Sequence, residues 1–114
     1  MNRYKLFKAG INFNDGVERL NNDKEMYGQL LHRFLEDTHY EQFCRAMEKG
    51  DVKEAFRCAH ALKGITGNLS MVKLHEDLVP LVEELRAGRI EGTEDMQEKV
   101  AKSYKDVIEV LENV

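Results

Sequence analysis

Helical periodicity runs through almost the whole chain and limits its fold more than any other feature. Apolar residues recur every three or four positions in four long segments, at about residues 22–49, 51–69, 71–87 and 93–113. That spacing places them on one face of an α-helix, which needs a partner surface to bury it. Gly50 and Gly88 end two of the segments and the turns between segments are short. We therefore predict an all-α fold, an antiparallel up-down four-helix bundle.

Two shorter helical segments precede the four long ones, at about residues 2–9 and 15–20. Asp15 and Glu18 stand three apart, as in a capping box that would begin the second segment. We expect these short N-terminal helices to pack on one end of the bundle. No linker, repeat or low-complexity tract divides the chain, so we predict a single domain over residues 1–114.

Three local signals refine the helix boundaries. Asp51 and Glu54 have capping-box spacing and should begin the second long helix. The apolar phase slips near residues 37–39, which predicts a bend in the first long helix. Pro80 lacks a backbone donor, so we expect a kink in the turn before it, or a helix that restarts there.

Composition excludes several classes of function. The net charge of −4 gives no basic surface for nucleic acid. No apolar run is long enough to span a bilayer, and the N-terminus lacks the hydrophobic stretch of a signal peptide. Cys44 and Cys58 have no metal-type spacing and are expected to be free thiols in a reducing compartment. These features predict a cytoplasmic location.

One polar face of the second long helix carries the residues of chemical interest. At about 100° per residue, His60 lies roughly 120° from the centre of the apolar stripe, so its imidazole should be exposed. Lys63 follows three residues later, and Arg57 precedes it by three. Gly64 and Gly67 share this face, although glycine within a helix costs about 1 kcal/mol relative to alanine. Close approach by another macromolecule would explain both glycines.

Simpler interpretations exist for each of these residues. An exposed helical histidine is ordinarily a solvated side chain, and Gly67 fits a helix C-cap. Glu36 and His39 form an E-x-x-H motif of the di-iron type, but no second copy occurs, which favours a solvated or half-buried His39. His75 falls on the next helix and could approach His60, although a plain surface role is favoured.

The stretch from His60 to Leu69, HALKGITGNL, resembles the H-x-L-K-G signature of histidine-containing phosphotransfer (Hpt) domains. A second similar stretch covers residues 15–34, and Gly50-Asp51 before the histidine helix is a third. The three occur in the family's order and spacing, and the resemblance spans roughly residues 4–110. It implies the same four-helix bundle.

The resemblance implies that His60 is the phosphoacceptor, through its Nε2 atom, and that it receives the group from a phospho-aspartate and passes it on in a multistep phosphorelay. Lys63 would compensate the charge of the phosphoryl oxygens. Five further residues are expected to serve docking and access: Gly64, Gly67, Arg57, Asn68 and Met71.

The expected partners are response-regulator receiver domains and a hybrid histidine kinase, with no nucleic acid and no membrane, for a monomeric protein. The chain has no Gly-rich nucleotide loop. We therefore expect a phosphoryl carrier without kinase activity that binds no cofactor itself, with Mg²⁺ held by the receiver domain.

Two positions depart from the family pattern. Ser70 stands where glycine is usual and could cap the next helix, and Val82 stands where a glutamine or glutamate often faces the histidine. Two alternatives remain open: an adaptor that binds receivers without transfer, and the excised phosphoacceptor domain of a larger chemotaxis-type kinase. The joint presence of His60, Lys63 and Gly64 favours transfer.

Overall fold

The computed structural model describes residues 1–114 and confirms the all-α prediction, with one isolated β-bridge between Ile11 and Met71. No helix is both long enough and apolar enough to cross a bilayer. The elements in chain order are α1 (Arg3–Lys8), α2 (Phe13–Arg19), α3 (Lys24–Arg33), the 3₁₀ turn η1 (Phe34–Glu36), α4 (His39–Lys49), α5 (Val52–Asn68), α6 (Val72–Arg86) and α7 (Glu94–Glu112).

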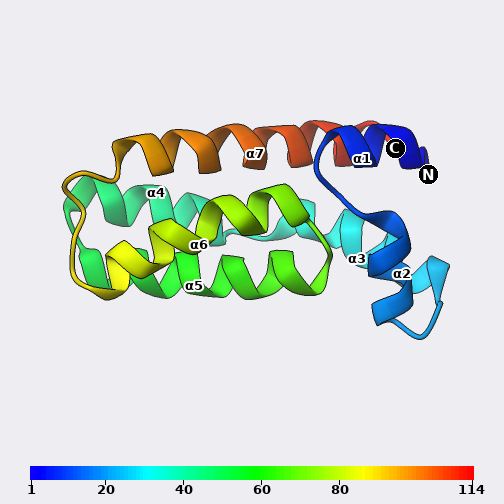
Figure 1. The fold of residues 1–114 in the computed structure, drawn as a ribbon, viewed down its shortest axis with the longest axis horizontal. Coiled ribbons are helices and arrows are strands. Elements are labelled where there is room, and N and C mark those ends of the chain that lie inside the picture. Colours follow the sequence, from blue (N-terminus) through cyan, green and yellow to red (C-terminus); the bar gives the residue numbers. More distant parts are fainter.

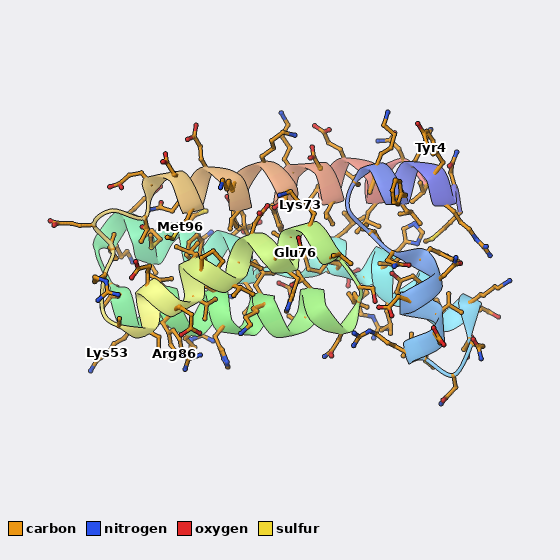
Figure 2. The ribbon with its side chains drawn as sticks, viewed as in Figure 1. Tyr4, Lys53, Lys73, Glu76, Arg86 and Met96 are labelled. Carbon is orange, nitrogen blue, oxygen red and sulfur yellow. The ribbon has the colours of Figure 1, made fainter.

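Helices α4, α5, α6 and α7 form the bundle, while α1, α2 and α3 gather at the end where both termini lie (Figure 1). Short turns reverse the chain between neighbouring bundle helices, so these run antiparallel. Lys53 at the start of α5 and Arg86 at the end of α6 accordingly lie at the same end of the molecule (Figure 2). The predicted architecture is confirmed.

The apolar faces of the helices meet in one core. Each fully buried leucine or valine contributes about 1.5–3 kcal/mol relative to an exposed one, and this burial holds the helices together. The largest side chains with almost no exposed surface are Tyr27, Leu6, Ile11, Leu31, Leu62, Met71, Leu74, Leu78, Leu81, Leu111, Val82 and Val100.

The segment predicted as one bent helix over residues 22–49 is two helices separated by a break. Asp37 has extended backbone angles, φ −71° and ψ 134°, and its carboxylate accepts a hydrogen bond from the backbone N–H of His39 at 2.9 Å. The break lets Phe34 and Tyr40 both pack on Tyr104 of α7, with ring centroids 6.1 and 4.0 Å away. Aromatic packing thus compensates for the lost helical hydrogen bonds.

Helix α5 begins as the sequence predicts. Gly50 ends α4 in the left-handed conformation, with φ 70°, and the Asp51 carboxylate accepts a hydrogen bond from the backbone N–H of Glu54 at 3.1 Å. Helix α6 runs through Pro80 without interruption, so a restarted helix was wrong. Pro80 is exposed, and water can reach the carbonyl group that has lost its donor.

Helix α2 begins earlier than predicted, because Asn12 and not Asp15 is its N-cap. The Asn12 side chain accepts a hydrogen bond from the backbone N–H of Asp15 at 3.0 Å. The Asp15 carboxylate is thereby available for other contacts. It accepts a hydrogen bond from the Ser70 hydroxyl at 2.6 Å, which ties α2 to the turn between α5 and α6.

The turn after α5 is held by further contacts from the N-terminal region. Ser70 has φ 54°, a left-handed conformation that glycine adopts more easily, and its carbonyl accepts a hydrogen bond from the Asn12 N–H at 2.9 Å. The Tyr27 hydroxyl donates to the Leu69 carbonyl at 2.7 Å, in space that a side chain at Gly16 would fill. The expected capping role of Ser70 was wrong, since Met71 is the N-cap residue of α6.

Candidate functional site

A cavity of about 360 Å³ opens beside His60 at the C-terminal half of α5. Its lining combines two cationic side chains with two imidazoles and contains no carboxylate, although the chain as a whole carries a net charge of −4. The lining residues are Arg19, His60, Lys63, Gly64, Gly67, Asn68 and His75. We call this cavity the His60 pocket; its composition suits a multiply charged anion.

His60 is exposed on the outer face of α5, as its position relative to the apolar stripe predicts. Its ring stacks on that of Phe56 one turn earlier, with centroids 5.4 Å apart and planes 18° from parallel. The Arg86 guanidinium also lies over the Phe56 ring, 4.9 Å from its centroid. The imidazole is therefore supported on one face by an aromatic ring while its nitrogens remain accessible from solvent.

Gly64 leaves open space beside His60. A Cβ atom built at this position would meet no atom within 4 Å, so even a small side chain here would project into solvent above the pocket. Lys63 is half-buried and lines the same pocket. Asn68 is exposed at its far end. The structure thus brings together His60, Lys63, Gly64 and Asn68, four of the residues that the sequence predicted.

Gly67 also lines the pocket, but for a different reason from the one predicted. A Cβ atom at Gly67 would lie 3.0 Å from Cε1 and 3.1 Å from Nδ1 of His75, which is closer than ordinary contact. The missing side chain therefore makes room for an imidazole of this chain, and not for a visiting protein. His75 Nδ1 lies 2.9 Å from the Lys63 carbonyl oxygen, to which a protonated Nδ1 donates.

Two predicted docking residues lie away from the pocket. Met71 has no exposed surface, because the turn after α5 brings it against Ile11 and into the core. Arg57 is exposed, but its guanidinium is paired with the Glu54 carboxylate and also donates to the Gln42 side chain at 3.1 Å. Neither residue belongs to the pocket lining. The docking role of Met71 is corrected because the residue is buried, whereas Arg57 is exposed and its docking role stays a prediction.

Val82 lies fully within the core and cannot orient the imidazole. The hydrogen bond that the family's glutamine or glutamate would supply from this position is therefore missing. The stack on Phe56 is the contact that orients the His60 ring in this protein.

Sequence reasoning missed one pocket residue and undervalued another. Arg19 reaches the pocket from α2, 41 positions before His60 along the chain, and no periodicity connects the two. His75, assigned a surface role, is half-buried and faces the pocket from α6. The position of His75 could have been predicted, because Gly67 and His75 lie near the ends of two helices that a short turn joins.

The remaining histidine and cysteine chemistry does not form a site. His39 Nδ1 lies 3.0 Å from the Asp37 carboxylate, and no three histidine, cysteine or acidic residues are grouped in a way that could hold a metal ion. Cys44 and Cys58 are free thiols, as predicted, and burial raises the pKa of each. Both thiols are therefore poor nucleophiles near neutral pH.

The family model that matches this chain is the Hpt domain, over residues 29–113. The chain therefore belongs to the Hpt domain family, which functions in histidine phosphotransfer in two-component systems. Comparisons with curated proteins and with solved structures found no match. The match begins after α2, so Arg19 lies outside it, while His60 and the other pocket residues lie within it.

Proposed function

We propose that this protein is a phosphoryl carrier of a multistep phosphorelay, in which His60 accepts the phosphoryl group of a receiver-domain phospho-aspartate and passes it on. The observation that supports this most is an exposed imidazole at the edge of a cationic pocket without carboxylates. A phosphoryl group on a side chain carries about −1.5 to −2 charges at neutral pH, and such a pocket offsets them.

The transfer needs no acid or base from this chain. Near neutral pH an ordinary imidazole is largely unprotonated and has a lone pair on one ring nitrogen. That lone pair forms the N–P bond, with Nε2 as the proposed atom. The P–O bond to the partner's aspartate breaks, and its electron pair remains on the carboxylate. The reverse step on a second receiver regenerates free His60.

Two further parts of the proposal draw on the pocket, and the others follow from what the family resemblance implies. Lys63 offsets the charge of the phosphoryl oxygens, and the open space at Gly64 lets the receiver's aspartate come close to the ring. In this proposal the receiver domain holds Mg²⁺, and a separate hybrid histidine kinase supplies the kinase activity. The protein meets the receiver in the cytoplasm. One monomeric domain over residues 1–114 is sufficient for this role.

The decisive experiment incubates the protein with a receiver domain carrying labelled phospho-aspartate. We expect the wild type to acquire label in an acid-labile, base-stable form, and His60→Gln to acquire none. His32→Gln is the matched control, because His32 is an exposed histidine on α3 outside the pocket, and it should label like the wild type. Equal labelling of His60→Gln and wild type would contradict the assignment.

One observation favours a second candidate, an adaptor that binds receivers without accepting phosphate. Val82 supplies no hydrogen bond to orient the imidazole, and the stack on Phe56 is the contact that the structure shows for the ring. The same experiment separates the two functions. A wild type that forms a complex with the receiver by calorimetry but takes no label would be the adaptor.

A further inference from the structure

The His60 pocket has a cation that comes from outside the four-helix bundle. Arg19 lies on α2, in the N-terminal region that precedes the family match. We propose that Arg19 is a phosphoryl-binding residue, and that its guanidinium, together with Lys63, holds the phosphoryl oxygens when His60 is loaded. This inference rests on the proposed function and adds to it a residue that the bundle itself does not contain.

The orientation of the Arg19 side chain supports this role. Its Nε donates to Asp15 Oδ2 at 3.0 Å, one turn earlier on α2, and this contact leaves both terminal NH₂ groups for a ligand. The side chain remains 54% exposed, so a ligand reaches the guanidinium without displacing core contacts. Two parallel N–H groups match two oxygens of a phosphoryl group, which lysine cannot do with a single ammonium.

Asp15 is in turn fixed to the histidine helix. The same carboxylate oxygen accepts the hydrogen bond from Ser70, in the turn that follows α5. The Ser70 hydrogen bond, with a smaller contribution from Arg19, lowers the pKa of Asp15, so the carboxylate is ionised throughout the neutral range. A continuous chain of contacts therefore runs from the end of α5 through Ser70 and Asp15 to Arg19. This chain of contacts holds the Arg19 side chain in the lining of the pocket.

Charge balance explains why a second cation is useful. A phosphorylated His60 would bring close to two negative charges to the pocket, whereas Lys63 alone supplies one positive charge. Arg19 adds a second cationic side chain to the lining, and its ion pair with Asp15 engages Nε while the terminal NH₂ groups stay available to the phosphoryl oxygens. Arg19 then affects both the rate of phosphoryl uptake and the stability of phosphorylated His60, because the negative charge of the phosphoryl group is present in the transition state and in the product.

The test compares Arg19→Gln with Arg45→Gln. Arg45 on α4 pairs with Glu41 in the same i, i+4 arrangement at 3.8 Å, is also exposed, and does not line the His60 pocket. Both substitutions change the net charge equally, so long-range attraction of a receiver is matched. Arg19→Lys, which keeps the charge but loses the paired donors, is the third variant. The readouts are the rate of label uptake, the equilibrium division of label between the two proteins, and the midpoint of thermal unfolding.

We expect Arg19→Gln to take up label about fivefold more slowly and to shift the equilibrium about fivefold toward the receiver, a modest value for an exposed charge-assisted contact. Arg19→Lys should lie between Arg19→Gln and wild type. Arg45→Gln should stay within about twofold of wild type, and all variants should unfold at similar temperatures. The difference between wild type and Arg19→Gln should shrink at high salt, which a purely structural effect would not show.

Two outcomes would overturn the inference, and they are distinguishable. Equal rates and equilibria for Arg19→Gln and Arg45→Gln, with a wild type that labels normally, would remove Arg19 from the pocket's chemistry and leave the proposed function standing. A wild type that never takes label would overturn the proposed function, and this inference with it.

Discussion

The two sides of His60 along α5 differ in one respect that decides their chemistry. Each side presents a cation three residues away, Arg57 before the histidine and Lys63 after it. Glu54 lies three residues before Arg57 and closes an ion pair with it. The positions three and four residues from Lys63 on either side are Ala59, His60, Thr66 and Gly67, none of which is acidic.

This comparison shows that spacing on a helix fixes which face a residue occupies but not whether its charge is free. On the N-terminal side the face is closed by local pairing within α5 and with Gln42. On the C-terminal side the face stays open, and α2 and α6 add Arg19 and His75 to it. The half of α5 that lines the His60 pocket is thus the half whose own cation has no acidic neighbour on the helix.

The largest expected effect tests whether the open side is the side that a receiver approaches. Gly64→Leu should slow phosphoryl uptake by about 100-fold, the loss that a misplacement of roughly 1 Å can cause, with little change in the unfolding midpoint. Gly28→Leu, the same replacement in α3 outside the pocket, is the control, since a Cβ there meets only the Met1 methyl group at 3.5 Å. Unchanged kinetics for Gly64→Leu would show that the partner does not need this space.

A smaller effect distinguishes the two cations directly. Lys63→Gln should reduce the rate of phosphoryl uptake about tenfold, because a charge-assisted contact contributes about 1.5 kcal/mol or more. Arg57→Gln should leave the rate within about twofold, since this guanidinium lies outside the lining of the His60 pocket and is held by Glu54 and Gln42. The measurement is the rate of label transfer at low and high salt. If the two variants slow transfer equally, the contrast between the two sides of His60 does not hold.

The smallest effect concerns stability and compares the two glycines of the pocket. Gly64→Ala should raise the free energy of unfolding by about 0.5–1 kcal/mol, because the helix gains a better former and nothing blocks the methyl group. Gly67→Ala should raise the free energy of unfolding by less, because its methyl group must displace the His75 ring. Urea unfolding measures both. In a His75→Ala background the two glycine substitutions should become equivalent, and a persistent difference would contradict the assigned contact.

The part of the site that the sequence predicted correctly lies within a single helix. Periodicity placed His60, Lys63 and Gly64 on one polar face, since neighbours on a helix need no knowledge of the fold, and Asn68 was predicted as a docking residue of the same helix. The bundle itself followed from four amphipathic segments and short turns. Arg19 and His75 could not be placed in the same way, because their approach depends on how α2 and α6 pack against α5.

The errors have physical causes of the same kind. Met71 was placed at the rim because it follows the end of α5, but the pairing of its backbone with Ile11 turns it into the core. The single helix over residues 22–49, with a bend near residues 37–39, was predicted from its apolar residues alone. The aromatic cluster of Phe34, Tyr40 and Tyr104 favours a break, and such a cluster is formed only when α7 is in place.

The hydrogen bonds from Tyr27 to Leu69 and from Ser70 to Asp15 determine how much of the chain must be kept when the domain is transferred to another protein. A transplant cut at residue 29, where the family match begins, would keep the helix that carries His60 but discard both Tyr27 and Asp15. Ser70 would then occupy an unfavourable backbone conformation without the bond that compensates for it. Chimeric relay proteins built from this chain should therefore carry residues 1–28 as an integral part of the module.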